Sequence, residues 1–111
     1  QVVLAYSVRD LSELSYREGI AEIEAQHEQQ FSFIPVITRE NVEGAIKQRI
    51  TLSIEDGSFE AAAGISIDED SHIMMCGNSA MLTSVTESLE KRGLRKHRRR
   101  EPGHITTEKY H

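Results

Sequence analysis

A short turn of small residues, placed between an apolar stretch and a helical pattern, limits the folds open to this chain. The apolar residues 73–75 lead into Cys76-Gly77-Asn78, after which apolar side chains recur at helical spacing. This order predicts a buried strand at 72–76 and a helix at 79–92. Ligands of open α/β sheets bind outside the carboxyl ends of the strands, where a glycine lets them approach the backbone closely.

The rest of the chain alternates between strand and helix patterns. An apolar run predicts a buried strand at residues 2–6, and a β-rich run predicts an edge strand at 31–37 that contains Pro35. A last strand is predicted at 105–109. Helices are predicted at 10–26, where Asp10 and Glu13 form a capping box, and at 58–64. Between these elements we predict a loop or short helix at 41–48, a short turn at 51–54 and an acidic surface turn at 68–71. The alternation predicts an α/β fold with a Rossmann-like parallel sheet and helices on both faces.

Length and composition predict one domain, residues 1–111, with a single core. No apolar run approaches the roughly 18 residues of a membrane span. The only cysteine cannot form an internal disulfide and no signal peptide opens the chain, which favours the cytoplasm. The His, Cys, Asp and Glu residues lack metal-ligand spacing. We therefore expect no membrane segment and no metal.

Charge is distributed unevenly along the chain. Residues 1–90 hold 5 Lys and Arg against 16 Asp and Glu, whereas residues 91–111 hold 8 against 2. The basic excess is concentrated in residues 91–100. Such a run could attract nucleic acid or an acidic protein, or it could be a solvated loop.

Several short motifs together resemble the bacterial ferredoxin (flavodoxin) NADP reductases. Residues 76–81, Cys-Gly-Asn-Ser-Ala-Met, are similar to that family's Cys-Gly-Asn-Pro-x-Met signature. Further motifs fall in the family's order, namely Val8-Arg9, Leu14-Ser15-Tyr16, Thr38-Arg39-Glu40, Gln48-Arg49-Ile50 and the ending from Pro102 to Tyr110. The resemblance covers the whole chain and implies the C-terminal NADP-binding domain of a flavin-dependent reductase.

The resemblance also implies what this chain lacks. Gln1 begins within an apolar strand pattern and without an initiator methionine, which predicts a fragment. In the family, a first strand and a glycine-rich turn precede this point, and no Gly-x-Gly-x-x-Gly motif occurs here. We therefore expect a partial NADP-binding domain whose FAD-binding domain lies outside the chain, and which is inactive alone.

Three arginines are candidate ligands of the 2′-phosphate that distinguishes NADP from NAD. Arg9 and Arg39 each follow a predicted strand and Arg49 lies in the next loop, with Thr38 as an added hydroxyl donor. The planar guanidinium donates two parallel hydrogen bonds to phosphate oxygens. These positions match the family's 2′-phosphate arginines. The alternative is that each arginine is a surface charge paired with a neighbour such as Asp10 or Glu40.

The remaining site residues follow from the resemblance. It places Tyr16 on the adenine ring, although Tyr16 could instead pack on the sheet. It places Cys76 beside the reacting C4 of nicotinamide, although Cys76 could also be a small core residue. The same segment contributes three further expected site residues, Gly77, Asn78 and Met81. Gly77 is expected to let the nicotinamide ring approach, and Met81 to be a core residue beneath it.

The chain departs from the family pattern at three positions. Thr51 stands where a proline often follows Arg49-Ile50. Ser79 replaces the family's proline and is expected to cap the helix. His111 replaces the terminal aromatic residue that contacts the flavin, which leaves Tyr110 as the aromatic candidate. The other four histidines are expected to be structural or solvent-facing, namely His27, His72, His97 and His104.

The implied activity is hydride exchange between NADP(H) and FAD, with single electrons passed to ferredoxin or flavodoxin by a monomer. The reductase component of an oxygenase would share most of this pattern. A nucleic-acid-binding module that uses residues 91–100 is the alternative from a different class, and it lacks interleaved aromatic residues for base stacking.

Overall fold

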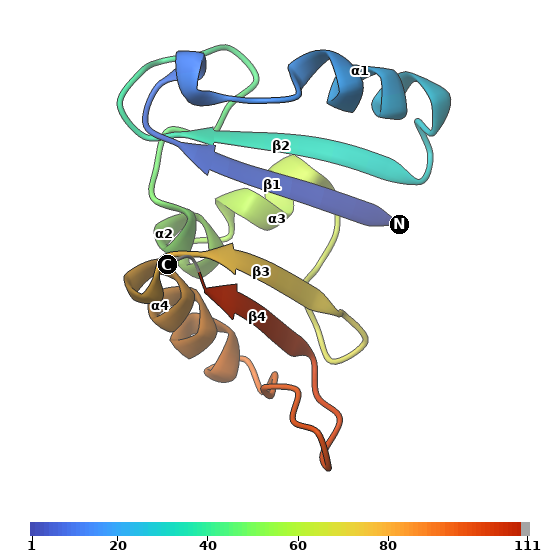
Figure 1. Cartoon of the computed structure of the whole chain (residues 1–111), viewed down its shortest axis with the longest axis vertical. Helices are drawn as coiled ribbons and strands as arrows, with labels where there is room; N and C mark the ends of the chain where they lie inside the picture. Colours follow the sequence, from blue (N-terminus) through green and yellow to red (C-terminus); the bar gives the residue numbers. More distant parts are fainter. Residues whose placement is uncertain (110–111) are drawn as a thin grey trace. The chain divides into compact units, whose positions relative to one another are not determined.

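A computed structural model describes residues 1–109, which divide into two compact units, residues 1–64 and the residues from 65 onward (Figure 1). The first unit holds β1 (Val2–Val8), the 3-10 turn η1 (Leu11–Glu13), α1 (Arg17–Gln26), β2 (Phe31–Ile37), α2 (Ile50–Glu55) and α3 (Ser58–Ala63). The second unit holds β3 (Ile73–Gly77), α4 (Ser79–Glu90) and β4 (Ile105–Lys109). Within the described residues, no helix combines the length and apolar character that crossing a membrane requires.

The first unit is built on one pair of parallel strands. β1 pairs with β2 in a register that runs from Val2 opposite Phe31 to Val8 opposite Ile37. Helix α1 lies on one side of this pair and α3 on the other, and both contact β2 (Figure 1). The core between them contains fully buried Val36 and Ile37, together with Ile20 and Phe59. Parallel strands covered by helices confirm the predicted α/β class.

β1 is less buried than its apolar sequence predicts. The Val2 side chain is 60% exposed and Leu4 is also exposed, whereas Val3 and Ala5 are partly buried. This alternation means that one face of the strand's first half has no cover among the described residues. The prediction of a buried strand is therefore wrong here, because an apolar run does not reveal whether both faces are packed.

The helix predicted at 10–26 is interrupted. η1 ends at Glu13, because the next residue, Leu14, has an extended backbone and a buried side chain, and α1 begins only after Tyr16. Tyr16 has a φ of 62°, in the left-handed region. A continuous helix does not form because these two residues leave helical geometry, and the apolar spacing fits the broken arrangement as well as it fits one helix.

β2 has its backbone donors satisfied along the edge that faces away from β1. The N–H of Phe31 donates to the His27 carbonyl at 2.9 Å, and the N–H of Phe33 donates to the Glu24 carboxylate at 3.2 Å. Pro35 has no N–H, and the N–H of Ile37 donates to the Ile46 carbonyl at 2.8 Å. Pro35 therefore lies at a sheet edge, as predicted.

The connections in the first unit agree with the sequence in part. Residues 41–48 contain no helix, which selects the loop from the two predicted possibilities. The turn predicted at 51–54 is instead the short helix α2. α3 ends as predicted on Gly64, which has a φ of 70°.

The second unit pairs β3 with β4 in parallel, from Ile73 opposite Ile105 to Gly77 opposite Lys109. Helix α4 packs on both strands, and buried apolar side chains fill the space between them, namely Leu82, Val85, Leu89, Leu94 and Ile105. β3 is not a fully buried strand as predicted, because Met74 is 85% exposed and Cys76 is exposed. The strand alternates instead, with Ile73 and Met75 partly buried.

Candidate functional site

The arginines that follow β1 and β2 leave the sheet side by side. The ladder continues past the strands, since the N–H of Thr38 donates to the Val8 carbonyl at 3.0 Å and the N–H of Arg39 donates to the Arg9 carbonyl at 2.9 Å. Arg9 and Arg39 are both exposed, and Thr38 is half-buried. We call this carboxyl end of the β1–β2 pair, with its two arginines, the arginine edge.

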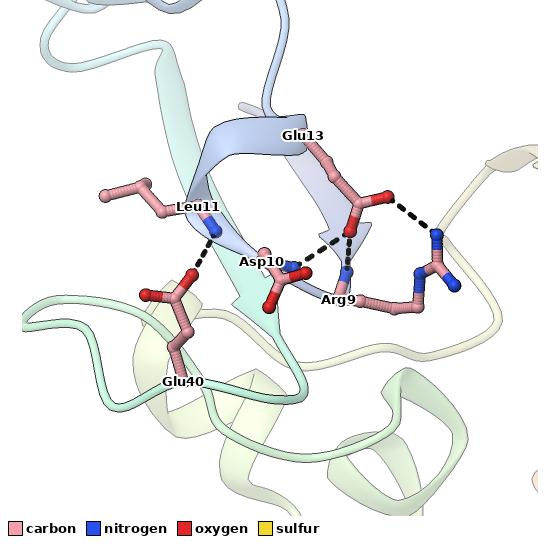
Figure 2. Close-up of polar contacts among 5 residues, drawn as sticks. All are labelled: Arg9, Asp10, Leu11, Glu13 and Glu40. Atoms are coloured by element: carbon pink, nitrogen blue, oxygen red, sulfur yellow. Dashed lines mark hydrogen bonds and ion pairs between the residues drawn. The ribbon is translucent and has the colours of Figure 1, made fainter.

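The Glu13 carboxylate lies at the arginine edge and binds three donors (Figure 2). Its Oε1 accepts the backbone N–H groups of Arg9 and Asp10 at 3.2 and 3.0 Å, and its Oε2 accepts Arg9 Nη2 at 3.1 Å. The hydrogen bond from Arg9, with that from the Asp10 backbone, lowers the pKa of Glu13 from its ordinary value. The same pair raises the pKa of Arg9. The predicted Glu13-to-Asp10 contact of the capping box is thus present, and it also holds Arg9.

A second carboxylate joins the two strand ends. Glu40, just after β2, accepts the N–H of Leu11 at 2.7 Å through Oε1 (Figure 2). This bond ties η1, which follows β1, to the segment that follows β2. Glu40 therefore acts on the backbone and is not the partner of an arginine.

The alternative in which each arginine is a surface charge paired with a neighbour holds, among the described residues, for Arg9 but not for Arg39 or Arg49. Arg9 is paired, with Glu13 and not with Asp10. Within residues 1–109, the Arg39 and Arg49 side chains form no hydrogen bond or ion pair. Arg49 is the exposed residue before α2, so it comes from a different element than the arginine edge. Two guanidinium groups are therefore free to bind an anion.

Tyr16 is an exposed aromatic residue in a costly conformation. Its side chain is 83% exposed, so the alternative of a tyrosine packed on the sheet does not apply. Its φ of 62° costs about 1 to 2 kcal/mol for a residue with a side chain. Strained residues concentrate at binding sites, where the surrounding structure holds them in place.

In the second unit, the Cys-Gly-Asn turn joins β3 to α4. The Cys76 thiol is exposed and Cys76 lies opposite Glu108 in the β3–β4 register, so Cys76 is not the small core residue of the alternative interpretation. Gly77 is buried, and a Cβ added to it would overlap the Met81 Cε. The half-buried Met81 side chain therefore uses the space that glycine leaves.

Asn78 caps α4. Its Oδ1 accepts the N–H of Met81 at 2.9 Å. The prediction that Ser79 caps the helix is wrong, because the backbone enters the helix at Ser79 and the extended residue before it holds the cap position.

Residues 95–104, which include most of the basic run, form an ordered loop before β4, which we call the basic loop. Arg98 and Glu101 exchange two backbone hydrogen bonds of 3.0 Å, which places Arg99 and Arg100 at the turn between them. Gly103 is essential to its closure, because a Cβ there would lie 2.6 Å from the Lys96 carbonyl carbon and 2.7 Å from the Arg95 carbonyl oxygen.

Two histidines hold the basic loop, and sequence patterns do not identify their partners. His104 Nδ1 accepts the N–H of Arg95 at 3.0 Å, and its Nε2 lies 2.8 Å from the Glu69 carbonyl oxygen. His97 Nδ1 accepts the N–H of Gly103 at 3.3 Å. An accepting nitrogen carries no proton, so His104 is neutral and donates from Nε2. Both residues are structural, in line with the expectation.

The described side chains hold no group of three histidines, cysteines or carboxylates close enough to bind a metal ion. The predicted site residue Tyr110 lies outside the described residues.

The sequence pattern of a known family matches most of the chain. The oxidoreductase NAD-binding domain family matches residues 1–87. This chain belongs to that family. The matched residues include the arginine edge and the turn that follows β3.

Curated relatives narrow the comparison to one group of reductases. A Buchnera aphidicola subsp. Schizaphis graminum (strain Sg) protein named flavodoxin/ferredoxin–NADP reductase is 32% identical over 111 residues, which are 98% of this chain and 43% of that protein. The Escherichia coli (strain K12) protein of the same name is 37% identical over 82 residues, or 73% of this chain and 33% of that protein. The motif-based resemblance is confirmed. The chain spans less than half the length of these relatives.

A solved structure has the same fold. The crystal structure of a ferredoxin NADP+ reductase from Neisseria gonorrhoeae with bound FAD and NADP matches with a TM-score of 0.86 and 31% identity. The match covers 96% of this chain and 43% of that chain. It confirms the α/β fold class predicted from the alternating pattern.

Proposed function

We propose that residues 1–111 are a partial NADP-binding domain of a flavin-dependent ferredoxin or flavodoxin NADP reductase, and that the arginines recognise the 2′-phosphate. The observation that carries this proposal is the arginine edge, where Arg9 and Arg39 leave parallel strands in adjacent positions. The free guanidinium groups of Arg39 and Arg49 fit a dianion, because each can donate two parallel hydrogen bonds to phosphate oxygens. Thr38 adds a hydroxyl donor beside them.

The other site residues orient the rest of the nucleotide. The exposed ring of Tyr16 stacks on adenine. The exposed Cys76 thiol contacts the nicotinamide, with Gly77 and Asn78 in the same turn, and Met81 supports Gly77 from within the unit. Bound together, the nicotinamide and the flavin supply the hydride chemistry, while the protein supplies orientation and electrostatics. FAD is held mainly by a domain outside this chain, so we expect the chain alone to lack reductase activity.

Electron transfer to an acidic carrier, ferredoxin or flavodoxin, is the proposed second half of the reaction. The basic loop presents exposed Arg98, Arg99 and Arg100 around one turn. Such a cluster attracts an acidic protein over roughly one Debye length, about 10 Å at 0.1 M salt. Neutralising the three arginines should slow carrier-dependent turnover at low salt and leave reduction of a small neutral acceptor unchanged. If reduction of the small acceptor were slowed as well, the three arginines would belong to the catalytic site, which would contradict the docking role.

The arginine proposal is tested by nucleotide selectivity in the complete reductase. Arg39→Ala or Arg49→Ala should lower the NADPH/NADH ratio of kcat/KM by about 10- to 150-fold, because each removes a charge-assisted contact. Arg17→Ala, which removes the same charge from the first residue of α1, is the control and should leave the ratio unchanged. An unchanged ratio in both test variants would exclude these arginines as 2′-phosphate ligands.

The nicotinamide contact is tested by the rate of flavin reduction. Cys76→Ser in the complete enzyme should slow hydride transfer in stopped-flow measurements and leave the affinity for the adenylate part of NADP intact. A normal hydride rate combined with lower stability would instead assign Cys76 to packing.

A further inference from the structure

We propose that Glu13 sets the nucleotide preference of the arginine edge, because its carboxylate competes with a 2′-phosphate for Arg9 and so weakens the selection of NADPH over NADH. This inference rests on the proposed function of the arginine edge. It concerns a residue that the phosphate-binding pattern itself does not include.

The Glu13 carboxylate is fixed in position. Two backbone N–H groups, those of Arg9 and Asp10, hold its Oε1 at 3.2 and 3.0 Å, while Oε2 accepts Arg9 Nη2 at 3.1 Å. An ordinary surface ion pair lets its carboxylate swing into water when a competitor arrives. Here the backbone contacts retain the negative charge beside Arg9 whether or not the guanidinium stays bound.

A 2′-phosphate at Arg9 would therefore meet a fixed negative charge. The guanidinium would have to share its Nη2 between two anions, and the phosphate dianion would lie within about 5 Å of the Glu13 carboxylate. In a water-like medium at moderate salt, such repulsion lowers affinity about 3- to 10-fold. Asp10 and Glu40 are the other carboxylates of this edge, and neither is paired with Arg9.

NADH does not suffer this repulsion. It carries a neutral 2′-hydroxyl in place of the phosphate, and a hydroxyl can donate a hydrogen bond to a carboxylate, as NAD-binding domains use an acidic residue for the ribose. The same Glu13 that opposes NADPH is thus neutral or favourable toward NADH. Arg39 and Arg49, which have no such partner within residues 1–109, retain the underlying preference for the phosphate.

The test is a double-mutant cycle in the complete reductase, with Glu13→Gln, Arg9→Gln and the two combined. Glutamine keeps an oxygen that accepts the two backbone N–H groups, removes the charge and replaces the Oε2 that accepts Arg9 Nη2 with an NH2 group, so Arg9 is released. Calorimetry compares adenosine 2′,5′-bisphosphate with 5′-AMP, which lacks the 2′-phosphate, and kinetics compare kcat/KM for NADPH and NADH. Glu22→Gln, the same change on the exposed face of α1, is the control. Circular dichroism verifies folding of each variant.

We expect Glu13→Gln to raise the preference for the 2′-phosphorylated ligand about 3- to 10-fold, and to raise it less when Arg9 is already Gln, because only the direct repulsion of the phosphate then remains. If Glu13→Gln does not fold, Glu13→Asp withdraws the carboxylate from Arg9 and should give a smaller rise. An unchanged preference would overturn the proposal, and a fall would mean that Glu13 orients Arg9 for the phosphate.

A failure of the proposed function gives a different result from a failure of the role proposed for Glu13. A wild-type enzyme that does not distinguish adenosine 2′,5′-bisphosphate from 5′-AMP would refute the arginine site and with it the role of Glu13. A wild-type preference that Arg39→Ala abolishes and Glu13→Gln leaves unchanged would refute only the role of Glu13.

Discussion

Replacing Gly103 by alanine adds a methyl group where the basic loop has no room for one. The new Cβ would lie 2.6 Å from the Lys96 carbonyl carbon and 2.7 Å from the Arg95 carbonyl oxygen, and closer still to the Lys96 oxygen. These are backbone atoms, which cannot rotate aside as the end of a side chain can. The segment around residue 103 must therefore move away from Arg95 and Lys96.

The cost of this movement has three parts. Overpacking of this kind destabilises a fold by about 1 to 3 kcal/mol. The shift also weakens the hydrogen bonds from Gly103 N–H to His97 and from His104 N–H to the Arg95 carbonyl, each worth about 0.5 to 1.5 kcal/mol when intact. Alanine restricts the unfolded chain, which returns about 0.4 to 1 kcal/mol. The net loss of unfolding free energy is therefore about 1 to 5 kcal/mol, and it reaches the upper end only if both hydrogen bonds are lost.

Urea unfolding followed by circular dichroism measures this loss. With an m-value of about 1.5 kcal/mol/M, the midpoint should fall by about 0.7 to 3 M. Gly19→Ala is the matched control, because Gly19 lies in α1 with no atom within 4 Å of its added Cβ. That variant should gain about 0.5 to 1 kcal/mol. An unchanged or higher midpoint for Gly103→Ala would refute the close approach of Gly103 to the Lys96 carbonyl.

Three further outcomes are expected. Tyr16→Gly should raise the unfolding free energy by about 1 kcal/mol in urea titrations, because glycine removes the cost of the positive φ, whereas Tyr16→Ala should not raise it. Equal stability of the glycine and alanine variants would contradict strain at Tyr16. The Arg9 hydrogen bond lowers the pKa of Glu13 from 4.5, so its stabilisation is complete above that pH and is lost as the pH falls through the lowered pKa. The stability difference between wild type and Glu13→Gln should therefore shrink as the pH falls below 4.5, and a constant difference would exclude the linkage. Nitrogen-15 NMR at neutral pH should find His104 protonated at Nε2 only, and a proton on Nδ1 would contradict its bond from Arg95.

Periodicity and strand order predict most elements of this fold and one part of its site. The strand at 31–37, the helix that begins at Ser79 and the last strand follow from local patterns. The adjacency of Arg9 and Arg39 follows from them too, because residues that come after neighbouring parallel strands must leave the sheet at the same edge.

Other features depend on contacts that a local pattern does not contain. The left-handed Tyr16 interrupts a stripe of apolar residues that fits a single helix equally well. The exposure of Met74 and Cys76 depends on whether both faces of β3 are covered, which an apolar run leaves open. His104 meets Glu69 across 35 positions of sequence, so no short motif marks that contact.

The edge of β2 also bears on how the protein behaves at high concentration. A further strand can add to a sheet only where the edge offers free backbone donors, and such additions begin many aggregates. Along β2 these donors are occupied by His27, Glu24 and Ile46, and Pro35 has none to offer. The edge is thus closed to a strand from another molecule without a bulge, by backbone carbonyls, one carboxylate and a proline. Glu24→Ala, which frees the N–H of Phe33, would reopen one position of that edge to intermolecular pairing.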